Sequence, residues 1–435
     1  MKTYAVISGL VVLLLCFFIN SNFNSTNKKR VVNFNDYEKY LTLNENLKLE
    51  NIKTEIDFWE KKYSYSPNQY TYLIKLASLN SQLFDITGNI NNLYTAENLL
   101  LDCNSRVNGK SASIHRSIAK NYISQHRFKD ALLHLESALY LGENKLNTEK
   151  MLFDVYMELG SYDEAKKKLT IIQDYDDFDY LIRLAKWNDY KGNLDDAIRV
   201  MEKAMVLANQ SKNNQQKEWI YSNIADFYGH AGRIEESYQY YLKTLELDNN
   251  NMYALKGIAW IAFSNDRSVT KSSKIIDFIE SKHLVPDLYL LKADIYEYQD
   301  NIPAKEKALK MYFNVLEQNN YGDMYNKYNA LLFAESSDKK DIALQIAKKE
   351  INNRPTPESY DLLAWTHYNM GNYQQAYEIA MNYTINKSHE PTILLHNELI
   401  LKANNKLTKE NSNKSELLES LYELGPNLEN QIKNI

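Results

Sequence analysis

The feature that most constrains this chain is a short helical pattern that repeats along most of its length. A small residue in an apolar helix is followed by an aromatic residue, a polar turn that often holds glycine, and a second helix with its own small residue. The marker residue of each first helix recurs at intervals of 32 to 42 residues, most often 34. The markers are Ala77, Ala119, Phe153, Ala185, Ala225, Ala259, Ala293, Ala330 and Ala364. A period of this length is typical of helix pairs that stack in one dimension.

The residues of each repeat have physical roles that follow from this stacking. Two short helices cannot each bury a face alone, so each needs a partner within its repeat and another in the next repeat. Small residues let the helix axes approach closely, and the second helices place alanine at residues 131, 165, 197 and 376. Gly160, Gly192, Gly232 and Gly371 are placed to end first helices in the left-handed conformation. The longer intervals before Ala119 and Ala225 predict longer helices or loops near residues 88–92 and 209–214.

The clearest copies begin at Tyr360 and at Tyr221, and the two align without gaps through Ala364 and Ala225 to the glycine turn. In these features the chain resembles the tetratricopeptide-repeat (TPR) superfamily, whose period is 34 residues. The resemblance covers roughly residues 35–400. It implies an all-α fold, a right-handed TPR-like α-solenoid of about nine or ten helix pairs.

The sequence predicts four parts along the chain. They are an N-terminal hydrophobic anchor or signal segment with a polar linker (1–30), an opening helix pair (31–69), TPR-like repeats (70–390) and C-terminal capping helices (391–435). Only 12 Gly and 7 Pro are present, too few for a chain built from many tight turns. The formal net charge of −5 removes the usual electrostatic reason for binding nucleic acid, so we expect no nucleic-acid partner.

An unbroken apolar run from Ala5 to Ile19 stands at the N-terminus. It is slightly longer than the apolar core of a typical signal peptide and shorter than a comfortable bilayer span. Lys2 favours a cytoplasmic N-terminus, whereas Lys28-Lys29-Arg30 would resist translocation. An uncleaved anchor, a cleaved signal, lipidation at Cys16 and a hydrophobic tail are the alternatives. We expect a chain that is membrane-anchored by this single segment or exported to the cell envelope.

Catalytic and metal-binding patterns are absent from the sequence. The glycine-rich phosphate loops, HExxH, GxSxG and CxxC do not occur, and no two of the 8 histidines stand four residues apart on one helix. Cys103 falls at a small-residue position of a second helix, which predicts a buried structural thiol. We therefore expect no enzyme activity, no metal, no cofactor and no small-molecule substrate.

The remaining chemistry is recognition. The resemblance implies that a peptide lies along the concave face, where it meets residues at fixed positions of each first helix. The residues selected are Trp219, Asp226, His230, Tyr253, Trp260, Phe263, Tyr298, Trp365 and Tyr368. Tyrosine and tryptophan give a large contact area for little rotamer entropy. Alternatively, aromatics such as Trp260 and Trp365 pack into a neighbouring repeat.

These observations predict a non-catalytic protein–protein interaction scaffold of the cell envelope, which binds a peptide or helix of another protein along its concave face. The main alternative is a structural subunit of a membrane-associated assembly or secretion complex. An enzyme would need a site that the sequence does not reveal. A cytoplasmic regulator would require the apolar run to be a tail.

Overall fold

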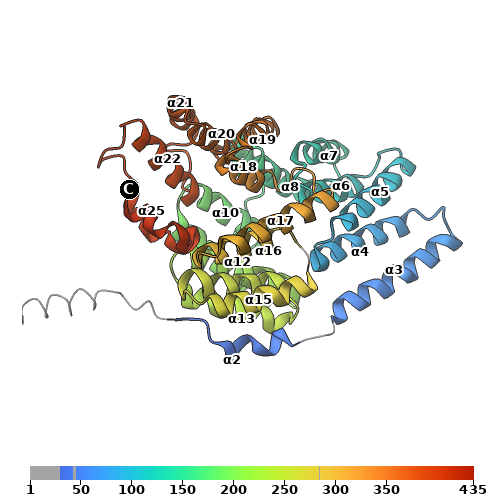
Figure 1. Ribbon diagram of the computed structural model, residues 1–435. Helices are drawn as coiled ribbons and strands as arrows, with labels where there is room; N and C mark the ends of the chain where they lie inside the picture. Colours follow the sequence, from blue (N-terminus) through green and yellow to red (C-terminus); the bar gives the residue numbers. More distant parts are fainter. Residues whose placement is uncertain (1–29, 43–45, 284) are drawn as a thin grey trace, which may run out of the picture.

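The computed structural model describes residues 30–42, 46–283 and 285–435, and every regular element in these ranges is helical (Figure 1). From α4 to α21 the helices form consecutive hairpins. In each hairpin an odd-numbered helix packs most closely on the even-numbered helix before it. The pairs before residue 250 are α4 (Thr71–Thr87) with α5 (Ile90–Arg106), α6 (Ala112–Ser124) with α7 (Phe128–Leu141), α8 (Lys145–Glu158) with α9 (Tyr162–Ile171), α10 (Phe178–Tyr190) with α11 (Leu194–Gln210), and α12 (Asn214–His230) with α13 (Ile234–Leu247). The later pairs are α14 (Met252–Trp260) with α15 (Val269–Lys282), α16 (Asp287–Tyr298) with α17 (Ile302–Gln318), α18 (Asn326–Glu335) with α19 (Lys340–Asn353), and α20 (Pro357–Asn369) with α21 (Tyr373–Tyr383). The all-α, TPR-like solenoid predicted from the repeat is confirmed.

The packing follows the small residues that mark the repeat. All the first-helix markers are buried, with exposed fractions of 0 to 3%. The second-helix alanines at residues 131, 165, 197 and 376 are fully buried. Gly160 and Gly192 end α8 and α10 with φ of +69° and +75°, in the left-handed region that glycine adopts at least cost. The repeat pattern therefore sets both the close approach of the helices and the points where they end.

The long intervals in the repeat are taken up by longer helices. α4, α5, α11 and α12 have 17 residues each, and only short turns join them to their partners. α14 passes directly into η2, a π-helix of residues Ile261–Asn265. In α15, where the second-helix signature is weak, Ser272 takes the place of alanine and is fully buried.

The array curves until later repeats lie against earlier ones. The turn between α4 and α5 meets the connection between α15 and α16, where His283 Nδ1 lies 2.8 Å from the carbonyl oxygen of Ile86. The turn between α8 and α9 meets the start of α20, and Arg354 forms an ion pair of 3.1 Å with Glu158. A Cβ at Gly160 would lie 3.0 Å from the carbonyl oxygen of Pro355. These contacts enclose the inner side of the helix array.

The sequence predicts an opening helix pair in residues 31–69, and the structure has one long helix there, α3 (Leu47–Tyr65), which packs on α4. It is preceded by two short elements, α2 (Phe34–Tyr37) and η1 (Glu38–Leu41). These lie on the middle of the array, beside α13 (Figure 1). The backbone N–H groups of Val31 and Val32 each donate to the Asp266 carboxylate at 2.9 Å.

No helix among the described residues is long and apolar enough to cross a bilayer. The predicted anchor or signal segment, with Ala5 to Ile19 and Cys16, lies outside the described residues.

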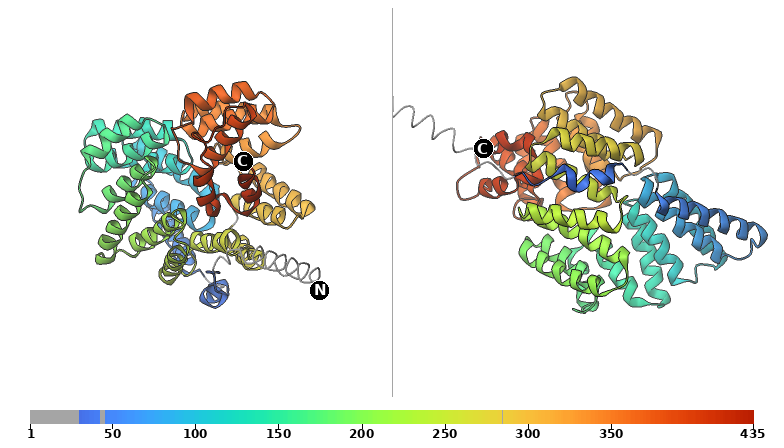
Figure 2. Two further views of the ribbon diagram at one scale, coloured as in Figure 1. Left: turned by 90° about the vertical axis from the view of Figure 1, so that its left-hand side faces the viewer. Right: turned by 90° about the horizontal axis from the view of Figure 1, so that it is seen from below.

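The predicted capping helices of residues 391–435 turn inward. α22 (Pro391–Ala403) packs on α20 and α21, and the chain then continues as α23 (Lys414–Glu419), α24 (Leu421–Leu424), η3 (Pro426–Leu428) and α25 (Glu429–Lys433). The left-hand view of Figure 2 shows these last helices within the arc formed by the repeats. We call residues 414–435 the C-terminal segment.

Candidate functional site

The C-terminal segment is held at both ends by apolar contacts. Leu417 and Ile432 are fully buried in a cluster with Leu394 and Leu399 of α22. Between these two anchors, α24 and η3 reach across to α12, η2 and α16. We call the faces of α12, α14, η2 and α16 that meet the C-terminal segment the inner surface.

The inner surface binds the backbone of the C-terminal segment at one carbonyl. The carbonyl oxygen of Tyr422 accepts hydrogen bonds from Trp260 Nε1 at 3.1 Å and from Ser264 Oγ at 2.6 Å. Trp260 ends α14 and Ser264 lies in η2, so both donors come from the point where the α-helix becomes a π-helix. Single π-turns of this kind are often found at functional sites.

A side-chain pair adds charge to this contact. His230, at the end of α12, forms an ion pair of 2.8 Å with Glu423. Burial lowers the pKa of His230, but the hydrogen bond and charge of Glu423, together with Asp226 and Asp189, outweigh burial and raise it to about 9. His230 is therefore positively charged at neutral pH and attracts the acidic residue of the C-terminal segment.

Asp226 is part of the same region but is already bound within the repeats. Its carboxylate accepts hydrogen bonds from the hydroxyl groups of Tyr241 and Tyr253. Burial raises the pKa of Asp226, and the two tyrosine hydroxyls oppose this shift. Asp226 thus orders the tyrosines beside the inner surface.

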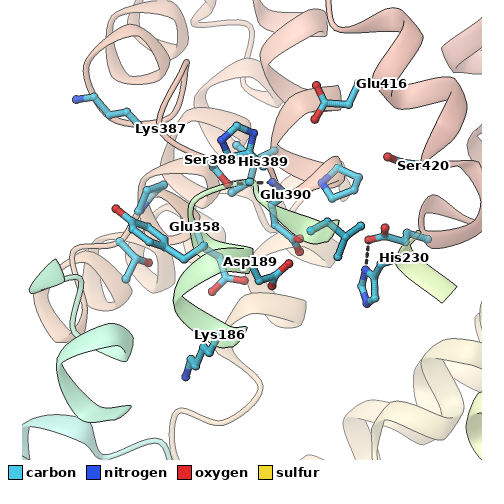
Figure 3. Close-up of a pocket in the computed structure, with 18 of the residues that line it drawn as sticks. Lys186, Asp189, His230, Glu358, Lys387, Ser388, His389, Glu390, Glu416 and Ser420 are labelled. Carbon is cyan, nitrogen blue, oxygen red and sulfur yellow. Dashed lines mark hydrogen bonds and ion pairs between the residues drawn. The ribbon is translucent and has the colours of Figure 1, made fainter. Parts of the chain in front are cut away.

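A cavity of about 760 Å³ lies beside the C-terminal segment (Figure 3). We call it the central cavity; its lining comes from α8 to α12, the start of α20, the connection into α22, and α23 and α24. Its acidic residues are Glu158, Asp189, Asp195, Glu358, Glu390, Glu416, Glu419 and Glu423. Its basic residues are Lys186, Arg354 and Lys387, with His230 and His389 beside them. Carboxylates outnumber cations, so the central cavity is acidic.

Most cations of the cavity wall already form ion pairs with carboxylates of the same wall. Glu158 lies 2.8 Å from Lys186 and 3.1 Å from Arg354. Arg354 also pairs with Glu358, which accepts a further ion pair of 2.6 Å from Lys327. These pairs join α8 to α10 and to α20, and they leave little positive charge for the rest of the cavity.

Asp189 and Glu390 have no such partner. Within the described ranges neither carboxylate has a cation within 4.0 Å. Burial is the largest cause that raises the pKa of each, and the negative charge of Glu423 adds to it. The more distant charge of His230 opposes this shift at Asp189, and those of Lys327 and His230 oppose it at Glu390, but the pKa of both carboxylates stays raised. In Figure 3, Asp189 of α10 and Glu390 before α22 point into the cavity from separate parts of the chain. A cation placed between them would stabilise both carboxylates.

A second cavity, of about 460 Å³, lies between α4 and the helices α12, α14 and α16. Trp219 and Tyr253 line it and are 41% and 50% exposed. Lys48 of α3 forms an ion pair of 3.0 Å with Asp248 at its edge. The start of α3 therefore closes one edge of this cavity.

The residues selected from the sequence divide into several groups. Asp226, His230 and Trp260 meet around Tyr422 and Glu423, and Trp219 and Tyr253 share the second cavity. Phe263 is fully buried, so it packs in the core rather than lining a surface, because α14 turns into η2 just before it.

The other selected residues pack against neighbouring aromatic rings. Tyr298 packs edge-on to Phe263 at 5.7 Å. Trp365 stacks on His396 of α22 at 3.9 Å and on Tyr368 at 4.9 Å. Trp365 and Tyr368 thus belong to the contact between α20 and α22, as the packing alternative for Trp365 proposed.

Sequence reasoning missed the acidic wall of the central cavity. Asp189 and Glu390 lie in different repeats, and nothing local in the sequence relates them. Glu416, Glu419 and Glu423 stand three and four residues apart, which places carboxylates on one face of a helical segment. That spacing is a signal that could have indicated an acidic surface at the C-terminus.

Metal-ligating groups and the buried cysteine are the next features of the described chain. In the part of the chain that is described, no three His, Cys, Asp or Glu side chains are grouped to hold a metal ion. Cys103 is buried, its sulfur lies 3.7 Å from the Tyr70 carbonyl oxygen, and burial raises the pKa of its thiol. The prediction of a buried structural thiol is confirmed.

Comparisons with known proteins agree with the fold. A tetratricopeptide-repeat family model matches residues 220–251, which cover the end of α12 and all of α13. No curated protein matches the sequence.

Several solved structures are similar in fold at low sequence identity. Yeast Tom70 is 12% identical with a TM-score of 0.40, and the match covers 92% of this chain and 94% of Tom70. Human IFIT1, solved as a dimer with PPP-AAAA, is 15% identical with a TM-score of 0.47, over 76% of this chain and 77% of IFIT1. A tetratricopeptide-repeat protein from Parabacteroides merdae is 15% identical with a TM-score of 0.39, over 65% of this chain and 99% of its own. One repeat of this all-helical solenoid, in α12 and α13, therefore matches the tetratricopeptide-repeat family model.

Proposed function

We propose that this protein is a non-catalytic interaction scaffold that receives a basic segment of a partner protein in its central cavity. The observation that carries the proposal is that Asp189 and Glu390 face the cavity and, among the described residues, have no cation within 4.0 Å. A lysine or arginine side chain of a partner would supply the missing charge and restore the ordinary pKa of both carboxylates.

The charge of the cavity also favours one class of partner over another. Glu416 and Glu419 of α23 add to the acidic wall. A polyanion such as RNA would meet like charges there, which costs free energy in an enclosed site. The volume of about 760 Å³ suits a few long side chains of an extended segment rather than a whole folded domain.

The proposal includes a membrane location. The apolar run from Ala5 to Ile19 would tether the scaffold to a membrane or direct its export to the cell envelope. Val31 and Val32 pack in one cluster with residues of α13 and α15, so a tether would leave from the middle of the array. Fractionation at alkaline pH tests this part: an anchored chain stays with the membrane pellet, and recovery in the supernatant would contradict anchoring.

Titration of the full chain with a fluorescent peptide of alternating lysine and glycine tests the binding proposal. We expect saturable binding that weakens as salt rises, because exposed charges are screened. The Asp189→Asn/Glu390→Gln variant should bind the peptide about tenfold more weakly, a loss of about 1.4 kcal/mol.

The matched control removes two carboxylates elsewhere. Glu55 and Glu60 are exposed on α3, far from the lining of the cavity, and Glu55→Gln/Glu60→Gln changes the net charge equally. This control should keep the affinity of the unchanged protein. Equal weakening in both variants would assign the binding to overall charge and would reject the cavity as its site.

A further inference from the structure

The C-terminal segment makes the contacts on the inner surface that a bound peptide would make. The backbone carbonyl oxygen of Tyr422 accepts hydrogen bonds from the side chains of Trp260 and Ser264. The next side chain, Glu423, pairs with His230 at 2.8 Å. A backbone contact combined with a specific side-chain pair is the usual way in which a groove recognises an extended segment.

The aromatic ring of Tyr422 occupies its own position on α12, next to Gly229. The Tyr422 ring lies over Gly229, where a Cβ would come within 2.7 Å of Cε1 of the ring. Burial raises the pKa of the Tyr422 hydroxyl, and the nearby negative charge of Asp226 adds to this shift. A side chain at position 229 would fill the space, so the absence of one leaves room for an aromatic ring.

The contacts continue beyond Glu423. Gly425 lies against the Trp260 ring, and Asn427 Nδ2 donates to the carbonyl oxygen of Asp294 on α16 at 2.8 Å. Arg267, just after η2, forms an ion pair of 2.8 Å with Glu429. Most of these contacts are polar and partly exposed, and such contacts exchange readily for equivalent ones from another chain.

We propose that the inner surface is a binding site for a segment with an aromatic residue followed by an acidic residue. In this structure Tyr422 and Glu423 occupy it as an internal ligand, and a partner segment with the same pair of side chains displaces them. The proposal deepens the scaffold function and rests on it, but it concerns a surface other than the acidic wall formed by Asp189 and Glu390.

Displacement would change the central cavity. Glu416, Glu419 and Glu423 form one wall of that cavity and belong to the C-terminal segment. A basic segment in the cavity therefore stabilises the docked form, and an aromatic–acidic segment on the inner surface opposes it. By linkage each partner weakens the binding of the other.

A fluorescent peptide with the sequence of residues 414–429 is the probe for this site. In the full chain the internal ligand is present at high effective concentration and competes with the probe. We expect the Tyr422→Ala/Glu423→Ala chain to bind the probe at least about tenfold more tightly than the unchanged chain. Adding Trp260→Ala should abolish that gain, and a probe with alanine at both positions should bind neither chain.

The same probe-binding assay includes a control variant and the results that would contradict the proposal. Tyr140 is 91% exposed, and Tyr140→Ala/Glu143→Ala removes the same side-chain types from the outside of the array without affecting probe binding. Equal binding to the unchanged chain and to the Tyr422→Ala/Glu423→Ala chain would overturn the proposal, as would binding to neither.

Hydrogen exchange on the unchanged chain is the second measurement. Saturating probe should make the amides of residues 421–425 exchange faster, and no change there would also count against displacement. The lysine–glycine peptide reports separately on the central cavity, so failure of one binding site is distinguishable from failure of the other.

Discussion

The repeats and the C-terminal segment are stabilised in different ways. In the repeats each helix packs on its neighbours in sequence through buried alanine and large apolar side chains, as Ile224 and Ile258 do with no exposed area. The middle of the C-terminal segment instead contacts helices far away in sequence, largely through hydrogen bonds and ion pairs such as that between His230 and Glu423. Apolar burial near in sequence gives a permanent framework, whereas polar contacts between distant parts give a contact that can be exchanged.

The largest expected effect comes from the repeat core. Ile258→Ala removes a fully buried side chain of α14 and leaves a cavity, so the free energy of unfolding should fall by about 2–5 kcal/mol. Chemical denaturation monitored by circular dichroism measures this. Ile171 is 56% exposed, and Ile171→Ala should change stability by no more than about 0.5 kcal/mol. Equal effects of the two substitutions would contradict the packing described here.

Gly229 tests the contact between the two regions. Gly229→Ala should disturb the docked Tyr422 ring and cost about 1–3 kcal/mol of unfolding free energy. In a Tyr422→Ala chain the same substitution meets no ring and should stabilise α12 by about 0.5–1 kcal/mol, because alanine favours helix more than glycine. Denaturation of the four chains gives the sign in each background. The same sign in both would mean that the ring does not lie on Gly229.

The ion pair between His230 and Glu423 makes the docked contact depend on pH. The pKa of His230 is raised from 6.5 to about 9 on folding, so its contribution is complete below pH 6.5 and is lost as pH rises to about 9. His230 is half exposed and also faces Asp226 and Asp189, so screening limits the contribution to about 1 kcal/mol. Denaturation at several pH values should show this loss in the unchanged chain and its absence in His230→Gln. Parallel curves for the two chains would refute the ion pair.

The smallest effect is expected where α3 meets the array. Lys48 is 45% exposed and pairs with Asp248 at 3.0 Å. Lys48→Gln should lower the free energy of unfolding by about 0.2–1 kcal/mol at low salt, and the difference should vanish at high salt. Thermal unfolding at two salt concentrations checks this. A large loss that salt does not reduce would show that Lys48 has a role beyond this exposed pair.

The sequence predicts the repeats because their signals are local. Alanine at residues 119, 185 and 225 marks helix faces, and Gly160 and Gly192 mark helix ends, so each repeat can be recognised within one period. Even so, the sequence does not tell whether extra residues lengthen a helix or a loop, and here they lengthen α4, α5, α11 and α12.

The candidate site depends on contacts between the repeats and the C-terminal segment, which the repeat period does not predict. His230 and Trp260 fall at concave positions, and the structure places both against the C-terminal segment. The partner residues Tyr422 and Glu423 lie in a different part of the chain, and their docking depends on how far the array curves. Phe263 falls at another of the predicted concave positions but is buried, because the π-turn after Trp260 changes which side chains face inward.

The central claim is that the C-terminal segment occupies the inner surface, and hydrogen exchange measures this most directly. We predict that the amides of residues 421–425 exchange slowly in the full chain, and that Trp260→Ala speeds their exchange without changing exchange in α4 to α9. Exchange at residues 421–425 as fast as in the polar loop of residues 404–413 would contradict it.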